Sequence, residues 1–120
     1  MTAAWSDDRG FATIVGAFAI AAVVAATIAV GYFGAAVVAR HRAQSAADLA
    51  ALAAAQDHVR GEPNPCATAQ QIVTEQRTGA QLVRCAPDGA DVVVRTAVPV
   101  PLGPFGLRRA EASARAGPID

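Results

Sequence analysis

The hydrophobic and polar positions divide the chain near residue 40. Residues 11–39 carry no charged side chain, although Arg9 and Arg40 bound them. The hydrocarbon core of a bilayer is about 30 Å thick and needs roughly 20 helical residues, so this run of 29 residues is long enough to cross it. Thr13 and Thr27 can bond their hydroxyls to main-chain carbonyls one turn back. The run therefore predicts a transmembrane helix.

A cleaved secretory signal and a buried helix of a soluble protein are the alternatives. A signal peptide has an apolar region of about 7–15 residues after a basic start, whereas this run is about twice as long and follows Asp7 and Asp8. A helix that is apolar on every side needs protein around it, and the remaining residues are too few to provide that cover. A membrane span is the stronger interpretation.

Helical signals continue beyond the apolar run. Residues 40–60 contain no Gly or Pro and are rich in Ala, the strongest helix former, and the first breaker is Gly61. We therefore expect one continuous helix over residues 11–60, about 75 Å long.

The projecting part of this helix has two faces. An apolar stripe contains Leu49, Leu52, Gln56 and Val59, with Ala53 alongside. A polar column contains Arg40, Gln44 and Asp48. We predict that the stripe packs against the C-terminal residues and that the column faces water.

Residues 61–120 predict a short helix followed by three strands. Asn64 before Pro65 is an N-cap signal, and we expect a helix over residues 66–78 with Gly79 at its end. Alternating positions predict an antiparallel sheet with strands over residues 81–86, 91–98 and 107–116, a tight turn at 87–89 and a proline-rich loop at 99–106. The expected inward positions of the short helix are Ala69, Ile72 and Val73. In the second strand Val92, Val94, Thr96 and Val98 share one face. In the third, Ala110, Ala112, Ala114 and Ala116 share a face that can lie close to another backbone, such as the projecting helix.

Composition narrows the classes of function. Ten arginines balance ten acidic residues and lysine is absent, so the net charge is zero. A neutral chain lacks the basic footprint of a nucleic-acid binder or of a polybasic membrane-surface binder. No phosphate loop, nucleophile elbow or ligand cluster accompanies His41 and His58. We expect no catalytic residue, cofactor, metal, nucleic acid or small-molecule substrate.

The two cysteines, Cys66 and Cys85, are separated by 18 residues. A disulfide across such a loop stabilises by about 3 kcal/mol in the chain-entropy model and indicates an oxidising compartment. The pair forms no C-x-x-C redox motif, and two ligands do not make a zinc site. The charges that flank the apolar run favour the opposite orientation. Two arginines, Arg40 and Arg42, follow the run and one, Arg9, precedes it, which favours C-terminal residues on the cytoplasmic side. These residues therefore do not decide on which side of the membrane the C-terminal residues lie.

Small residues recur at spacing four within the run, at Ala17, Ala21, Ala25 and Ala29. Such columns allow close helix–helix contact in a membrane. Chance is an equal alternative, since Ala makes up about a quarter of the chain. We keep a lateral contact of the span, with itself or with a partner, as one of two interpretations.

The sequence from Arg9 to Phe11, opening an apolar helix, resembles the start of type IV pilin-like proteins, which a peptidase cuts between the residues that stand here as Gly10 and Phe11. Residues 44–55 are similar to the segment that follows the span in TadE/TadG-like proteins of the Flp (Tad) pilus-assembly system. The motif residues are Gln44, Asp48, Leu49 and Leu52. The resemblance covers residues 9 to about 56.

The resemblance implies a small actinobacterial TadE-like protein that accompanies a secretion ATPase, with its C-terminal residues outside the cell. One position departs from the pattern. Such proteins usually carry Glu five residues after the cut, where this chain has Val15. That Glu is thought to pair with the new amino terminus of a neighbouring subunit. Val15 therefore argues against polymerisation in the manner of a major pilin, and against cleavage.

The sequence as a whole predicts an α+β membrane protein. Its parts are a leader-like segment (1–10), a transmembrane helix (11–39), an amphipathic continuation of that helix (40–60) and a small extracytoplasmic domain (61–120). We expect a single-pass plasma-membrane protein, a minor pilin-like or pilus-assembly subunit that binds other pilin-like or secretion-apparatus subunits. A small membrane-tethered or secreted extracytoplasmic protein acting independently of a pilus is the alternative.

Overall fold

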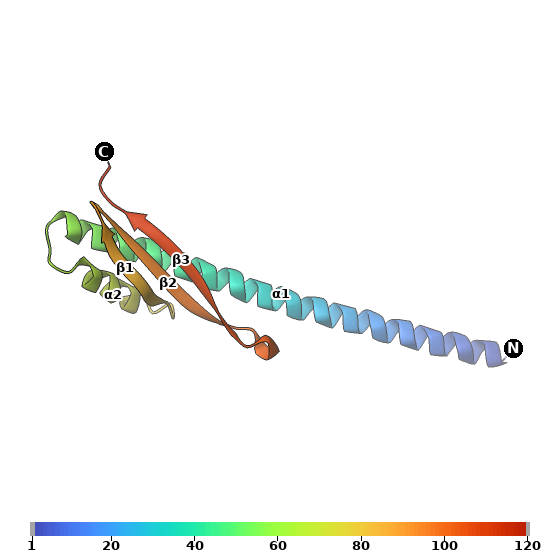
Figure 1. The fold of residues 1–120 in the computed structure, drawn as a ribbon. Coiled ribbons are helices and arrows are strands. Elements are labelled where there is room, and N and C mark those ends of the chain that lie inside the picture. Colours follow the sequence, from blue (N-terminus) through green and yellow to red (C-terminus); the bar gives the residue numbers. More distant parts are fainter. Residues whose placement is uncertain (1, 120) are drawn as a thin grey trace. The chain divides into compact units, whose positions relative to one another are not determined.

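The structure, a computed structural model, describes the backbone of residues 2–119 and the side chains of residues 9–119. Its elements are α1 (Thr2–Val59), α2 (Pro65–Glu75), β1 (Gln81–Asp88), β2 (Asp91–Pro101), the 3-10 turn η1 (Gly103–Phe105) and β3 (Leu107–Ala116), shown in Figure 1. The predicted fold class is confirmed: a long apolar helix, a short helix and a three-stranded antiparallel sheet. The chain forms two compact units, residues 1–34 and 35–120.

Helix α1 begins earlier than the sequence suggested and ends almost where expected. It includes Thr2 and the leader-like segment, so the helix does not start at Phe11. At the other end Gly61 has a φ of +80°, a conformation that glycine adopts without strain. There the amide of Gly61 donates to His58 O at 3.1 Å and the amide of Glu62 donates to Asp57 O at 3.0 Å. These bonds satisfy carbonyls that the last turn of a helix leaves free.

Helix α2 has the predicted N-cap and a shorter C-terminal end. The side chain of Asn64 accepts a hydrogen bond from the amide of Ala67 at 3.2 Å, and Pro65 is the first helical residue. The helix ends at Glu75 instead of residue 78 because Arg77 has a φ of +52° and cannot continue it. The expected inward face is confirmed, with Ala69 and Val73 buried and Ile72 packed against the same core.

The sheet has the order β1-β2-β3, and β1 and β2 are longer than predicted. Asp88 pairs with Asp91, so the turn contains residues 89 and 90, not 87–89. Strand β2 continues to Pro101 through part of the predicted loop, with Pro99 paired to Arg109 of β3. Proline is tolerated there because the pairing of β1 with β2 ends at Ala97. Beyond that residue β2 needs no donor on its β1 side. The predicted bounds of β3 are confirmed.

The sheet packs on an alanine face of α1. One core cluster joins α1 and α2 to the start of β2 and contains Ala50, Ala51, Ala54, Ala55, Ala69, Val73, Val92 and Val94. A second cluster joins an earlier part of α1 to the end of β2 and to β3 and contains Ala39, Ala43, Ala47, Val98, Val100 and Ala112. The predicted valine face of β2 and alanine face of β3 are the faces that the core contains. Because late residues of β2 meet early residues of α1, the strand runs antiparallel to the helix.

The prediction that the leucine stripe packs against the C-terminal residues is wrong. Leu49, Leu52 and Val59 are 49%, 52% and 63% exposed. Methyl side chains bring the helix backbone close to the sheet, and the hydroxyl of Thr96, fully buried, donates to Ala43 O at 2.6 Å. A leucine between the two layers would hold them apart and break this bond, because a close-packed interior does not absorb extra methylenes.

Candidate partner-binding surface

An exposed apolar face remains on α1, opposite its alanine face. We call this set the leucine face: Leu49, Leu52, Gln56 and Val59. The intervals of three, four and three residues are the a/d spacing of a seam between two helices. All four residues are exposed in the C-terminal unit. The sequence predicted the apolar stripe that these residues form, but not that the stripe would be exposed.

Two hollows flank the leucine face. The first, of about 350 Å³, lies between α1 and α2 and is lined by Leu49, Leu52, Ala53, Gln56, Ile72, Glu75 and Gln76. The second, of about 340 Å³, lies between α1 and the end of β3 and is lined by Leu52, Ala55, Gln56, Val59, Arg60, Gly117 and Pro118. Leu52 and Gln56 line both hollows. The face is therefore a ridge of side chains between two grooves, a relief into which the side chains of another helix can interlock.

The wall of the first hollow contains a polar group without a partner. The side-chain nitrogen and oxygen of Gln76 are buried, and they make no hydrogen bond to the residues that the structure describes. Buried polar atoms are usually paired. Gln76 had no sequence signal of its own, because it lies one residue beyond the end of α2.

The polar column is exposed, as predicted, and one of its members also contacts the sheet. The side-chain amide of Gln44 donates to Asp48 Oδ1 at 2.8 Å and to the main-chain oxygen of Ser113 at 3.3 Å. A side chain of α1 therefore satisfies part of the outer edge of β3, which has a strand on one side only. Gln44 and Asp48 therefore take part in hydrogen bonds within the chain, whereas Leu49 and Leu52 remain exposed.

The cysteines form a disulfide between Cys66 in α2 and Cys85 in β1. Their Cα atoms are 5.8 Å apart, within the usual range for such a bond. A hydrogen bond from the hydroxyl of Thr68 to Asp57 ties the same helix to α1. Together they hold the α2 wall of the first hollow in place.

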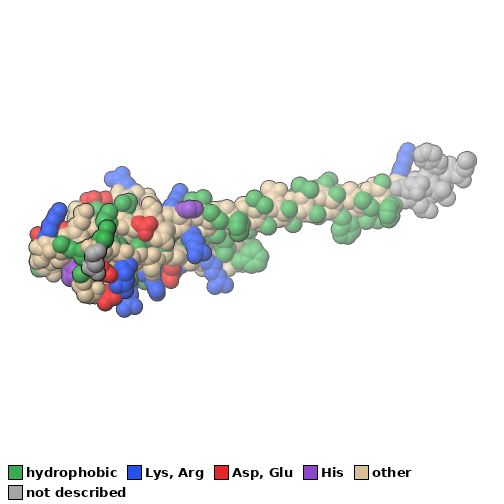
Figure 2. Space-filling view, turned by 90° about the horizontal axis from the view of Figure 1, so that it is seen from above, with side chains coloured by type: hydrophobic (Ala, Val, Ile, Leu, Met, Phe, Trp, Pro, Cys, Tyr) green, Lys and Arg blue, Asp and Glu red, His purple; other side chains and the backbone are tan. Residues whose placement is uncertain are grey.

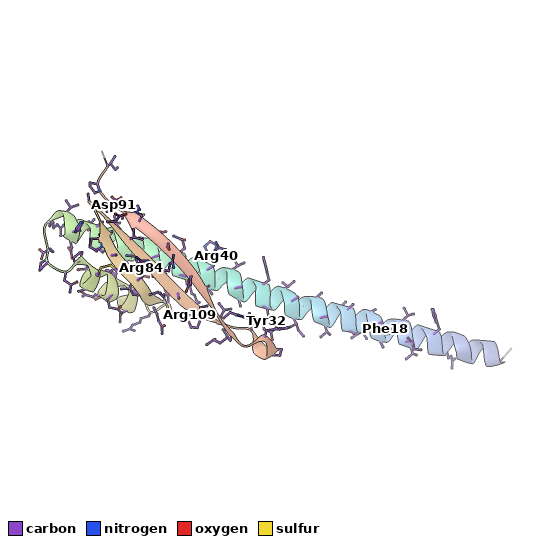
Figure 3. The ribbon with its side chains drawn as sticks, viewed as in Figure 1. Phe18, Tyr32, Arg40, Arg84, Asp91 and Arg109 are labelled. Atoms are coloured by element: carbon purple, nitrogen blue, oxygen red, sulfur yellow. A yellow bond between two sulfur atoms is a disulfide. The ribbon has the colours of Figure 1, made fainter. Side chains whose placement is uncertain are left out.

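Ionic contacts on the outer sheet face join β3 to the two residues that flank the turn between β1 and β2. The guanidinium group of Arg115 contacts Asp88 at 2.7 Å and Asp91 at 3.1 Å. These contacts, the hydrogen bond to Asp88 first, raise the pKa of Arg115 above its already high ordinary value. In Figure 3, Asp91 lies at one end of the sheet and Arg109 toward the other. The pairs are exposed and contribute little free energy.

His58, on α1, contacts the hairpin of β1 and β2. Its Nε2 lies 2.8 Å from the main-chain oxygen of Gly89, in the turn between β1 and β2. His41 is exposed. Within the described residues no three His, Cys, Asp or Glu side chains gather in a metal-binding arrangement.

The apolar run is largely exposed up to residue 35, whereas Ala36 and Ala39 at its end pack in the second core cluster. It belongs to a helix that is long and apolar enough to cross a membrane. Figure 2 shows hydrophobic side chains along this run and charged side chains over the C-terminal unit. Thr13 and Thr27 bond their hydroxyls to Arg9 O at 2.9 Å and Val23 O at 2.8 Å, as the sequence predicted. Phe18, which stands out from the helix in Figure 3, is 73% exposed.

Two predicted sites in the run stay predictions. Gly10 and Phe11 are consecutive exposed residues inside α1, and peptidase cleavage between them is untested. The column of small residues, Ala17, Ala21, Ala25 and Ala29, is also exposed. Its contact with another helix is untested.

A comparison with protein families finds a match within α1, the helix that contains both the apolar run and the leucine face. Residues 10–57 match a family described as putative Flp pilus-assembly TadE/G-like. The chain carries a TadE/G-like segment. The match ends two residues before the end of α1, so it includes the apolar run and most of the leucine face. No curated protein and no solved structure matched the chain.

The TadE/G-like assignment confirms the resemblance found in the sequence and supports a role in Tad pilus assembly. The sequence reasoning missed the buried alanine face within the matched segment. The recurrence of Ala39, Ala43, Ala47, Ala50 and Ala54 at intervals of three and four was the available signal.

Proposed function

We propose that this TadE/G-like chain is a membrane-anchored, minor pilin-like assembly subunit of a Tad-type secretion apparatus. Residues 11–39 anchor it in the plasma membrane, and the C-terminal unit presents the leucine face to another subunit. The observation that carries the proposal is the leucine face of α1, which is apolar and exposed. The family match covers most of this face. Single exposed apolar residues are ordinary on a surface, but a ridge with hollows on both sides is typical of an interaction site.

The expected occupant is a helix of another pilin-like subunit anchored in the same membrane. Anchoring aligns such helices side by side, and the a/d spacing of the leucine face suits that arrangement. Gln56 would then lie within the seam, where a polar side chain helps to select one register at a cost in stability.

The test is the double variant Leu49→Gln, Leu52→Gln, expressed at full length in cells that carry the apparatus. Glutamine keeps the helix propensity and removes the apolar contact. Buried apolar anchors often contribute more than 1 kcal/mol each, so we expect affinity for apparatus subunits to fall about tenfold or more. Co-purification of those subunits from detergent, with the partner identified by mass spectrometry, measures the loss.

The matched control is Val83→Gln, which changes an exposed valine of β1 outside the leucine face and should leave binding unchanged. Undiminished binding by the double variant would exclude the face as the contact. Recovery of the wild-type chain without any apparatus subunit would favour a protein that acts independently of a pilus.

We also propose that the C-terminal unit lies outside the plasma membrane. The disulfide between Cys66 and Cys85 supports this side, since such bonds persist in oxidising compartments. We expect a membrane-impermeant maleimide to label intact cells only after treatment with an impermeant reductant. Labelling that requires cell lysis and no reductant would place the unit in the cytoplasm.

A further inference from the structure

The hairpin between β2 and β3 points back along α1 toward the apolar run. We call residues 101–107 the hairpin tip. Along β2, Val94 belongs to the core cluster of Ala50 and Ala54, whereas Val100 belongs to the cluster of Ala39. The next inward residue, Leu102, packs on that second cluster together with Ala36. The tip therefore lies beside the last turns of the uncharged run, within the C-terminal unit.

The hairpin tip presents an apolar surface. No charged residue occurs between Arg95 and Arg108. Phe105 is 71% exposed and Leu107 is 68% exposed. Two neighbouring apolar side chains of this size cost solvation free energy when they face water. No core cluster of the unit includes them.

The backbone of the tip is largely satisfied within itself. The amide of Leu102 donates to Gly106 O at 2.9 Å, Phe105 donates to Leu102 O at 3.1 Å, and Gly106 donates to Gly103 O at 3.1 Å. Pro101 and Pro104 have no amide hydrogen. A loop with few free donors enters a poorly hydrated layer at a low cost, because unpaired N–H groups carry most of that penalty.

A band of arginines lies immediately behind the tip. Arg108 pairs with Val100 and Arg109 with Pro99, at the level where β2 meets Ala39. Arg40 and Arg42 occupy the same level on α1, and all four arginines are exposed. Figure 3 shows Arg40 and Arg109 toward the end of the C-terminal unit that adjoins the apolar run. Apolar and aromatic residues followed by cations suit the interfacial layer of a bilayer and its anionic head groups.

The length of the run leaves room for this contact. Its 29 residues extend about 43 Å as a helix, whereas the hydrocarbon core takes about 30 Å. About nine residues therefore lie in the interfacial layers. Residues 35–39 of the run belong to the compact unit that contains the tip.

We propose that the hairpin tip docks on the surface of the membrane that anchors the chain. Phe105 and Leu107 enter the interfacial layer, and Arg108 and Arg109 bind anionic lipid head groups. The contact fixes how far the C-terminal unit stands from the bilayer and hence the height of the leucine face. This inference rests on the membrane anchorage proposed above, and its test separates the two.

The test places a single tryptophan at chosen positions of the full-length chain. The starting variant is Trp5→Phe, which removes the one native tryptophan. Phe105→Trp reports on the tip, Phe18→Trp reports on the anchor, and Val59→Trp is the exposed control at the far end of α1. Each variant is reconstituted in nanodiscs of phosphatidylcholine and phosphatidylglycerol, with or without bromine on the acyl chains.

We expect bromine to quench emission from positions 105 and 18 but not from position 59, and emission from position 105 to shift to shorter wavelength than that from position 59. Quenching at 18 with none at 105 would overturn the inference and leave the anchor intact. No quenching at 18 would overturn the anchor and the inference with it. Protection of position 105 from aqueous iodide without bromine quenching would indicate a protein contact and would also overturn docking on lipid.

The arginines are tested in the same assay. We expect Arg108→Gln with Arg109→Gln to reduce quenching at position 105 when phosphatidylglycerol is present. The matched pair Arg84→Gln with Arg95→Gln, on the outer sheet face, should have no effect. Equal quenching in all three proteins, in charged and in neutral nanodiscs, would remove the head-group contact from the proposal.

Discussion

The size of individual side chains decides which face of α1 is buried. Ala43, Ala46, Ala47, Ala50 and Ala54 are fully buried although each offers one methyl group. Larger apolar residues on the same helix stay exposed, because the sheet approaches too closely to admit them. Thr96 shows how close the approach is, since its short hydroxyl spans the gap to a helix carbonyl. For the residues of α1, steric fit against the sheet therefore decides which side chains are buried, and their hydrophobicity does not.

The hydroxyl of Thr96 offers a direct measure of this contact. Thr96→Val keeps the shape and removes the bond to Ala43 O, so we expect the free energy of unfolding of the C-terminal unit to fall by about 1 kcal/mol. Pulse proteolysis of the full-length protein across a urea series measures the change. Thr74→Val is the control, because that hydroxyl is exposed and bonds to Gln70 O of its own helix. Equal urea midpoints for the two variants would contradict this role of Thr96.

At the scale of the element, α1 carries two apolar patterns with the same helical period. The alanine pattern faces the sheet and the leucine pattern faces outward. Both satisfy the spacing of an amphipathic helix, so periodicity alone does not choose between them. Strand β2 shows a related effect, because Pro99 ends a strand in sequence reasoning yet is paired with Arg109. It is tolerated there since β1 no longer pairs with β2 at that point.

The two patterns of α1 predict opposite responses to substitution. Ala47→Leu inserts three heavy atoms into a fully buried site and should lower the free energy of unfolding by about 1–3 kcal/mol. Leu52→Ala removes the same atoms from an exposed site and should change it by about 0.5 kcal/mol or less. The urea series described for Thr96 measures both. A larger loss of stability for Leu52→Ala than for Ala47→Leu would instead favour the packing that the sequence suggested, with the leucine stripe against the C-terminal residues.

At the scale of the whole molecule, the uncharged part of α1 is a candidate anchor, and we propose that the C-terminal unit binds partners. Within residues 11–34 the Val, Ile and Phe side chains are exposed, which water does not favour. The second has its own core, a disulfide and most of the charged residues. The TadE/G-like match, residues 10–57, includes parts of both units and supports a role in Tad pilus assembly.

A charge in the middle of the run tests the anchor. Val24→Arg should cost about 2.5–3.5 kcal/mol of insertion free energy, because an arginine at the centre of a spanning helix loses its hydration. We expect a smaller fraction of the chain to resist alkaline extraction from membranes. Leu52→Arg, outside the run, should leave that fraction unchanged. Full resistance in the Val24 variant would argue against a span centred there.

The sequence by itself determined the local features of this protein. An uncharged run of 29 residues, an unbroken alanine-rich helix, the Asn64 cap and the alternation of the strands each depend on neighbours in the chain. Only the tertiary structure decided which face of α1 meets the sheet, where β2 tolerates proline and which part of α1 lies beside the hairpin tip. Those outcomes depend on the distance between backbones that are far apart in sequence, and helical or strand periodicity carries no information about that distance.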